Sequence, residues 1–400
     1  MKKPFVKGGK ALTLAAALLC GAAFLGSFTA FGAAAQAESQ AGAQAEAQVF
    51  TPGVAGQITS CKISGDKQNV EIGFSSSGDV TGTDGNIYVF EMQPYEEELG
   101  SRSNFIASSP ALSAASVSVP LNLGTPQDKL YSRFVLAVFD GTKFIKVSQP
   151  HYITNPELIA KNQTPFNDPL TKKGLVIEID MLSDAFDLGV KHVTTNIAFS
   201  QIMGTGIDYQ YDGKTYHFNK GVVDAYDKTI SALSNKGMTV TVILLNDWNP
   251  NTPDLVYPGT QKNSNAFYYM FNAETEAGFD QTKAIASFLA QHYSGDNPNY
   301  GKVSNWIIGN EINNQQWNYM GPMDLTNYVK AYQKAFRVIY TAIKSTNAND
   351  RVYFSLDYNW MNEIDGKLKY GGKEIVDSFN SIANTQRSEE RRVGKECRSR

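Results

Sequence analysis

The sequence is poor in cysteine and histidine. It has three cysteines and four histidines in 400 residues, and two of the cysteines, Cys20 and Cys397, lie close to the ends of the chain. Cys61 is then left without an intramolecular partner, so no disulfide framework is expected. So few nitrogen and sulfur ligands give no zinc-type cluster and no cysteine nucleophile. We expect neither a metal nor another cofactor.

The sequence also lacks a basic cluster. Residues 1–37 carry four lysines, and residues 387–400 carry six basic and three acidic residues. The stretch between them has 26 basic and 36 acidic residues, a net charge of −10. Such a chain is a poor candidate for binding nucleic acid or an anionic membrane surface, and it suits a neutral partner.

The N-terminus has the pattern of a secretory signal. Lysines precede an apolar run from Leu12 to Phe31, and Ala35-Gln36-Ala37 fits a cleavage site. The run is long enough to span a membrane, so an uncleaved anchor is the alternative. We expect residues 1–37 to be a signal peptide and the protein to be secreted or extracellular, with no stable membrane insertion after cleavage. Residues 38–48 read as a low-complexity spacer.

Residues 49–153 have short apolar stretches separated by turn residues. The expected strands are Gln57–Ser64, Asn69–Phe74, Asn86–Glu91, Ser116–Leu121, Ser132–Phe139 and Lys143–Val147. Asp140-Gly141 is a hairpin signal between the last two. The pattern predicts a small all-β, sandwich-like domain that either binds carbohydrate or covers its neighbour. Residues 154–172, with three prolines, indicate a linker.

Residues 173–386 alternate between strand and helix patterns. The expected strands are Gly174–Ile179, Val190–Ala198, Thr239–Leu245, Val303–Asn310 and Arg351–Leu356. This order predicts a parallel sheet, either open and doubly wound or closed as a barrel. No Gly-rich loop follows the first strand, and polar and aromatic residues gather after successive strands, which favours the barrel. We expect a (β/α)8 TIM barrel truncated after about five βα units.

The stretch Trp306–Glu311 is a short apolar run that ends on an amide and a carboxylate. Barrel enzymes place catalytic groups at such strand ends. Asn310-Glu311 ends the fourth expected strand, and here the chain resembles the clan A glycoside hydrolases, in particular a little-characterised branch of secreted bacterial barrels. Their signature is Asn-Glu at the end of strand four. The resemblance covers residues 173–386.

This resemblance implies roles for both residues. Glu311 matches the catalytic acid/base, and Asn310 matches the residue that hydrogen-bonds the sugar 2-hydroxyl. The family's nucleophile is a Glu at the end of strand seven, and no residue of this chain corresponds to it. On this basis the fragment is expected to be inactive even if its parent is an enzyme.

Other strand ends supply candidate substrate-binding residues. They are Asn196 after strand two, Asn246, Asp247 and Trp248 after strand three, Trp317 six residues past Glu311, and Tyr358 and Trp360 beside Asp357 after strand five. Aromatic rings suit stacking on sugar rings, and loop self-packing is the alternative. Asn196 stands where many clan A members carry Arg, which weakens any inference about the particular substrate.

Residues 387–400 resemble a translated sequencing adapter of the kind found at the ends of misassembled metagenomic genes. The resemblance covers all fourteen residues. It implies a non-native tail and a natural sequence that is cut off after Gln386. A genuine basic tail is the alternative.

These features predict a secreted retaining glycoside hydrolase that acts on a poly- or oligosaccharide. The alternative is a non-catalytic glycan-binding or cell-surface protein on a barrel scaffold. A metal-dependent hydrolase lacks the His and Asp cluster that it would need. The sugar, the linkage, endo or exo action and the oligomeric state are left open.

Overall fold

The computed structural model describes residues 56–76, 82–111, 114–361 and 365–386. The predicted signal peptide, spacer and tail therefore lie outside the described residues. Within the described ranges, no helix combines the length and apolarity needed to cross a membrane.

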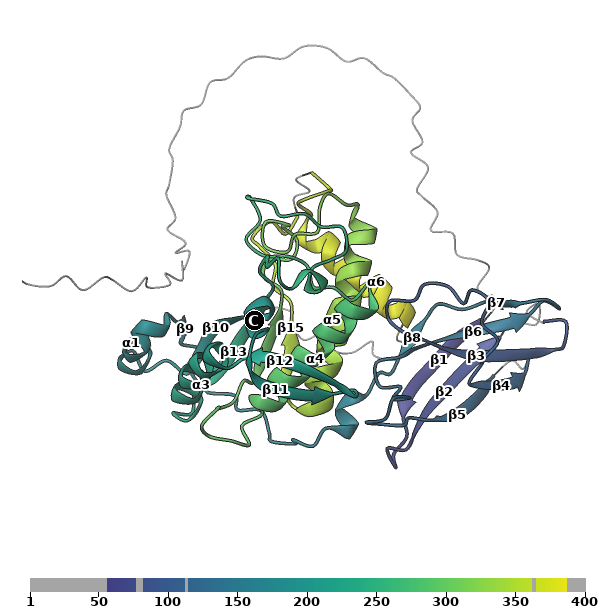
Figure 1. The fold of residues 1–400 in the computed structure, drawn as a ribbon, viewed down its shortest axis with the longest axis horizontal. Helices are drawn as coiled ribbons and strands as arrows, with labels where there is room; N and C mark the ends of the chain where they lie inside the picture. The colour runs from purple at the N-terminus through teal and green to yellow at the C-terminus, as the bar shows by residue number, and fades with distance from the viewer. Residues whose placement is uncertain (1–55, 77–81, 112–113, 362–364, 387–400) are drawn as a thin grey trace, which may run out of the picture. The chain divides into compact units, whose positions relative to one another are not determined.

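The first part of the described chain forms two antiparallel sheets (Figure 1). One consists of β1 (Gly56–Ile63), β2 (Asn69–Ser76) and β5 (Ala115–Pro120). The other consists of β4 (Ala107–Pro110), β3 (Asn86–Met92), β6 (Arg133–Phe139) and β7 (Phe144–Lys146), with β8 (His151–Tyr152) beside β6. All six stretches expected to be strands are found. The sequence missed β4, which is rich in serine, and β8, which has two residues.

Both sheets contribute to one apolar core. Ile58 and Ile72 from the first sheet and Val89 and Leu136 from the second are fully buried in it. Two sheets that share a core have the arrangement of a sandwich. The free thiol of Cys61 is buried in the same core, and burial raises its pKa well above the usual value.

A five-stranded parallel sheet follows. Its strands are β9 (Gly174–Val176), β10 (His192–Ala198), β13 (Thr239–Leu245), β14 (Asn305–Ile308) and β15 (Arg351–Tyr353), in the order β15-β14-β13-β10-β9. Each strand pairs in parallel with the next in the chain. This order has no reversal point, unlike the doubly wound sheet that was the alternative. The protein is thus α/β with a parallel sheet.

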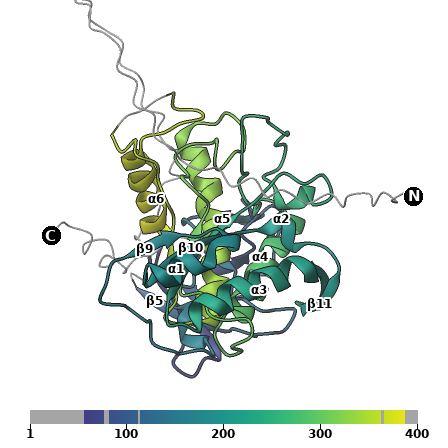
Figure 2. The ribbon, with the colours of Figure 1, turned by 90° about the vertical axis from the view of Figure 1, so that its left-hand side faces the viewer.

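Helices follow the strands. They are α1 (Leu182–Asp187), α2 (Phe199–Ile202), α3 (Lys220–Ser234), α4 (Glu276–His292), α5 (Leu325–Thr346) and α6 (Gly372–Gln386), with short 3-10 turns η1 (Pro156–Ile159), η2 (Ile179–Met181) and η3 (Pro253–Leu255) (Figures 1 and 2). The first expected strand ends early, at Val176, because Ile179 already belongs to η2. Between α2 and α3 lies the hairpin β11 (Gly206–Tyr211) and β12 (Lys214–Asn219).

Side-chain caps fix where the long helices start. Asn219 accepts a hydrogen bond from the Val222 N–H at the start of α3, and Thr275 accepts one from Gly278 at the start of α4. Asp324 does the same for α5. Each cap satisfies a backbone donor that the helix itself leaves unpaired. The positions of these helices against the sheet are therefore set by local sequence as well as by packing.

The described residues cover one face of the parallel sheet more completely than the other. Val242, Leu244 and Trp306 point into a core that also contains Ile230 of α3 and Leu289 of α4. On the other face Asn196, Ile243, Ile307 and Tyr353 form one row across the sheet through their register. Both ends of this row, Asn196 and Tyr353, are exposed, and Val176 on the edge strand β9 is 71% exposed. Parallel sheets in folded proteins normally have both faces covered.

Residues of the two antiparallel sheets also contact the helices. The Tyr131 hydroxyl lies 3.3 Å from Ser287 Oγ on α4, and the Lys334 ammonium on α5 donates to Glu97 at 2.7 Å. The Tyr131 ring packs edge-on against Phe279. The N-terminal β region thus packs against α4 and α5.

Asp350, just before β15, gives this fold a pH-dependent stability. Its side chain is 3% exposed, accepts a hydrogen bond from Trp306 Nε1 at 3.0 Å and faces Lys302 Nζ at 3.5 Å. Burial raises its pKa from 3.8 to about 6 because the protein withholds water from the carboxylate. Between these two pH values the folded chain holds a proton that the unfolded chain has lost, so stability falls as pH rises.

We predict that Asp350→Asn gains stability relative to the parent as pH rises from 4 to 6, by up to about 3 kcal/mol. Asn keeps an acceptor for Trp306 and has no proton to lose. Urea unfolding at several pH values measures the difference. Asp377→Asn is the control, since this carboxylate is 61% exposed in a helical pair with Lys373 and should change stability little at any pH. A pH-independent difference for Asp350→Asn would contradict the prediction.

Candidate active site

The backbone turns sharply where β14 ends. Gly309 has φ +74°, and a Cβ there would lie 2.9 Å from Ile312 Cγ2. Glu311 has φ +43°, in the left-handed region that costs a non-glycine residue roughly 1 kcal/mol. Glu311 is therefore held in a backbone conformation that its residue type disfavours.

Neighbouring strand ends hold this turn. The Glu311 N–H donates to Ser355 Oγ at 2.9 Å, and the Ile312 N–H donates to the Ser355 carbonyl at 3.0 Å. The Ser355 hydroxyl donates in turn to Asn310 Oδ1 at 3.4 Å. Ser355 follows β15, so pairing of β14 with β15 brings it to the Asn-Glu pair. Ser355 was not predicted as a site residue, because the expected strand Arg351–Leu356 placed it inside a strand, whereas β15 ends at Tyr353.

Two carboxyl groups whose pKa values shift in opposite directions lie here. Glu311 is half-buried, and burial, followed by the charge of Asp357, raises the pKa of its carboxyl. Partial burial alone would raise the pKa of Asp357 too, but hydrogen bonds from Asn313 and Asn359 outweigh it and lower that pKa. The two environments thus shift the two pKa values in opposite directions, so that Glu311 keeps its proton to higher pH and Asp357 loses its proton at lower pH than usual. Divergent environments of this kind separate an acid from an ionised partner in glycosidases.

The end of β13 adds a carboxylate and a ring. Asp247 is half-buried and accepts a hydrogen bond from Gln201 Nε2 at 2.5 Å, and burial raises its pKa. The half-buried Trp248 packs on Tyr269 with ring centroids 5.3 Å apart. Asn246 is 1% exposed and donates to the Leu255 carbonyl at 2.8 Å. Through that contact Asn246 holds the loop after β13 from inside the protein, below the surface that a ligand would contact.

The loops after β13 and β14 carry a stack of aromatic rings. The ring centroid of Trp317 lies 4.7 Å from that of Phe267 and 6.2 Å from that of Tyr268. In both pairs the ring planes are within 28° of parallel. The Phe267 N–H donates to the Gln316 carbonyl at 2.8 Å, which ties the two loops together. Phe267 is 51% exposed, so the stack reaches the surface.

The remaining predicted residues are more exposed. Asn196 lies on the open face of the sheet, in the row that also contains Ile243. Tyr358 is 93% exposed and Trp360 48% exposed beyond β15. Within the described residues no hydrogen bond or ring contact joins these three side chains to Glu311, so the structure does not gather them around the Asn-Glu pair.

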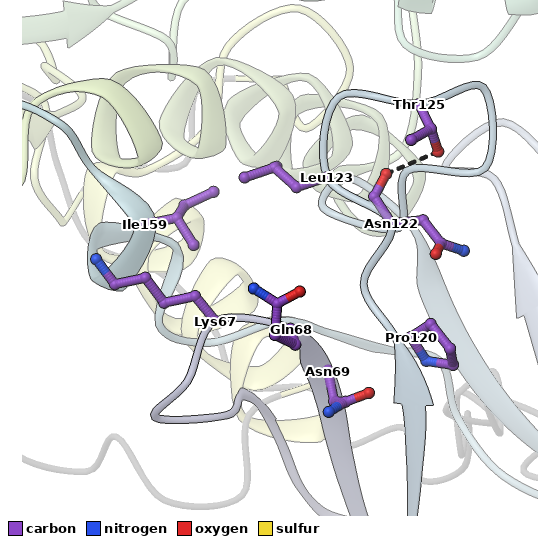
Figure 3. Close-up of a pocket in the computed structure, with 8 residues that line it drawn as sticks. All are labelled: Lys67, Gln68, Asn69, Pro120, Asn122, Leu123, Thr125 and Ile159. Atoms are coloured by element: carbon purple, nitrogen blue, oxygen red, sulfur yellow. Dashed lines mark hydrogen bonds between the residues drawn. The ribbon is translucent and has the colours of Figure 1, made fainter.

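The described residues offer no group of three or more His, Cys, Asp or Glu side chains that could hold a metal ion. A cavity of about 500 Å³ lies on the antiparallel sheets and contains none of the predicted site residues (Figure 3). Most of the side chains that line it are amides or aliphatic groups. The lining residues are Lys67, Gln68, Asn69, Pro120, Asn122, Leu123, Thr125 and Ile159.

Solved structures that the chain is similar to include three glycoside hydrolases. One is a family 39 glycoside hydrolase from Bacteroides cellulosilyticus WH2, 16% identical, covering 74% of this chain and 51% of that one, with a TM-score of 0.28. A family 1 β-glucosidase from Thermotoga maritima is 19% identical, covering 51% and 41%, with a TM-score of 0.30. An endoglucanase from the same organism is 14% identical, covering 56% and 56%, with a TM-score of 0.29. At these scores the likeness carries no argument about fold or activity.

The chain spans between 41% and 56% of the length of these three structures. Among curated proteins, no relative matches the sequence. A family profile matches residues 165–392, more than half of the chain, so it includes the whole parallel sheet and the Asn-Glu pair and ends inside the predicted non-native tail. The chain belongs to this family, DUF5722, a family of unknown function.

Proposed function

We propose that this chain belongs to an exported (β/α)8-barrel glycoside hydrolase in which Glu311 is the general acid/base. The observation that carries the proposal is the position of Glu311. It follows the fourth strand of a sequentially ordered parallel sheet, directly after an amide side chain, in an environment that raises the pKa of its carboxyl. Cleavage of a glycosidic bond requires a carboxylic acid that stays protonated until it donates to the leaving oxygen.

Asn310 has the second role. Its carbonyl oxygen accepts from Ser355, which leaves the amide N–H groups to donate. A sugar hydroxyl beside the scissile bond is an acceptor for such a donor. Hydrogen bonds to the sugar 2-hydroxyl that strengthen in the transition state contribute several kcal/mol in glycosidases.

The uncovered face of the parallel sheet supports a barrel that is completed by further strands. In a closed barrel the row Asn196, Ile243, Ile307 and Tyr353 faces the interior, where side chains from all strands pack in layers. Three more βα units would cover this row and join β15 to β9. They would also supply the nucleophile, about 5–5.5 Å from Glu311 in a retaining enzyme.

A non-catalytic glycan-binding protein on the same scaffold is the second candidate. The exposed stack of Phe267 and Trp317 favours it, because stacked rings bind sugars without any second carboxylate. The two functions differ in one measurement: turnover by the full-length parent protein. Under the hydrolase proposal the parent cleaves unactivated glycosides, and under the binding proposal it retains them unchanged.

We predict that Glu311→Gln lowers kcat of the full-length parent by about 10³-fold or more on unactivated glycosides, because the amide cannot donate the proton. Circular dichroism should show an unchanged fold. The matched control is Glu71→Gln, which alters an exposed glutamate on β2. Activity equal to that of the parent in Glu311→Gln would exclude the proposed acid.

We also predict that Trp317→Ala weakens oligosaccharide binding by about tenfold, since it removes a ring face worth roughly 1–2 kcal/mol in stacking. Isothermal titration on the chain described here measures the loss, and Trp317→Phe should restore part of it. Phe105→Ala, which removes a 43% exposed ring from the antiparallel sheets, serves as the control. Equal binding by Trp317→Ala and the parent chain would show that the stack is only loop packing.

A further inference from the structure

The segments that follow β14 and β15 are joined by a set of hydrogen bonds that ends on a carboxylate. Glu311 and Ile312 donate their N–H groups to Ser355. Two residues further along, Asn313 and Asp357 exchange two bonds. Asn313 Nδ2 donates to Asp357 Oδ1 at 2.6 Å, and the Asp357 N–H donates back to Asn313 Oδ1 at 2.8 Å. The position of Asp357 relative to Glu311 is therefore fixed through two bonded pairs.

Asn359 fixes the carboxylate itself. Its N–H donates to Asp357 Oδ1 at 2.8 Å, and its side-chain amide donates to Asp357 Oδ2 at 2.9 Å. Both oxygens thus accept hydrogen bonds, and such bonds favour the ionised form. Asn313 is 1% exposed and also donates to the Tyr370 carbonyl at 3.2 Å, so the clamp is anchored in the fold.

An anion held in this way acts on its neighbour at a distance. Like charges disfavour each other, so a fixed negative charge beside a second carboxyl group makes that group keep its proton to higher pH. After partial burial, the Asp357 charge is the cause that raises the pKa of Glu311. The neighbouring cation, Lys369, acts on Asp357 and helps to keep it ionised.

We propose that Asp357 is a positioning residue of the active site: held by Asn313 and Asn359, it presents a fixed negative charge to Glu311 and keeps that side chain in its acid form. This inference rests on the proposed function, in which Glu311 donates a proton. The proposed function takes its nucleophile from further βα units, so Asp357 is assigned the positioning role alone.

The test follows the titration of Glu311 in the full chain, which needs no activity. Glutamate labelled with carbon-13 at the carboxyl carbon gives one signal for each side chain, and Glu311→Gln identifies the signal of Glu311. In the parent chain we expect its midpoint above the usual value for a glutamate side chain. In Asp357→Asn, which keeps one acceptor oxygen for Asn313 Nδ2 and the Asn359 N–H but removes the charge, the midpoint should move down.

Asp324→Asn is a closely matched control. Asp324 accepts the same pair of bonds from Asn327, at 3.0 Å from its N–H and 2.7 Å from its amide, and its pKa is also lowered. It caps α5 and does not act on Glu311, so its replacement should leave the Glu311 midpoint unchanged. If Asp357→Asn does not fold, Asp357→Ser offers a smaller uncharged acceptor, with the same expected direction.

An unchanged Glu311 midpoint in a folded Asp357 variant would overturn the inference. In the active parent, Asp357→Asn should also shift the alkaline limb of the kcat/KM profile to lower pH, which a purely structural role would not do. The proposed function fails separately, if Glu311→Gln retains full activity. In that case the titration result still decides whether Asp357 acts on Glu311.

Discussion

Parallel pairing of strands that are consecutive in the chain is the constraint on which the site depends. Because each strand lies beside the next and runs in the same direction, the residues that follow β13, β14 and β15 emerge at one edge of the sheet. Backbone pairing of Ile307 with Tyr353 thus brings Ser355 to Asn310 and Glu311. The chemistry of the site comes from side chains, but their proximity comes from the ladder of backbone hydrogen bonds.

Electrostatics and backbone conformation act on the same few residues. Glu311 has a left-handed backbone and a carboxyl group with a raised pKa, and both states cost free energy. The bonds from Ser355 and the packing around Gly309 offset that cost. Unfavourable local states that persist because their surroundings enforce them are typical of functional sites. Glu311 thus has little of the freedom that an ordinary surface glutamate has.

The sequence predicted the elements better than it predicted their contacts. Short apolar stretches identified the strands, and Asp140-Gly141 identified the β6–β7 hairpin, because these signals are local. Asn313 and Asp357, which exchange two hydrogen bonds, are 44 residues apart in the chain. No local sequence pattern therefore indicates their contact. Asn246 shows the opposite error, since a polar residue after a strand was expected to face substrate, yet it is buried and bonded to Leu255. Burial of a single side chain depends on loops whose paths the sequence does not specify.

The two outer strands of the parallel sheet have a further consequence for handling the chain. Within the described residues β9 and β15 each pair with one strand, so each has a free row of backbone donors and acceptors. The two edge strands run in the same direction but expose opposite sides of the sheet. In such an arrangement β15 of one copy can add to β9 of another. Such head-to-tail contacts do not close on themselves and produce open-ended assemblies. Covering either edge would remove the row of donors and acceptors on which such a contact depends.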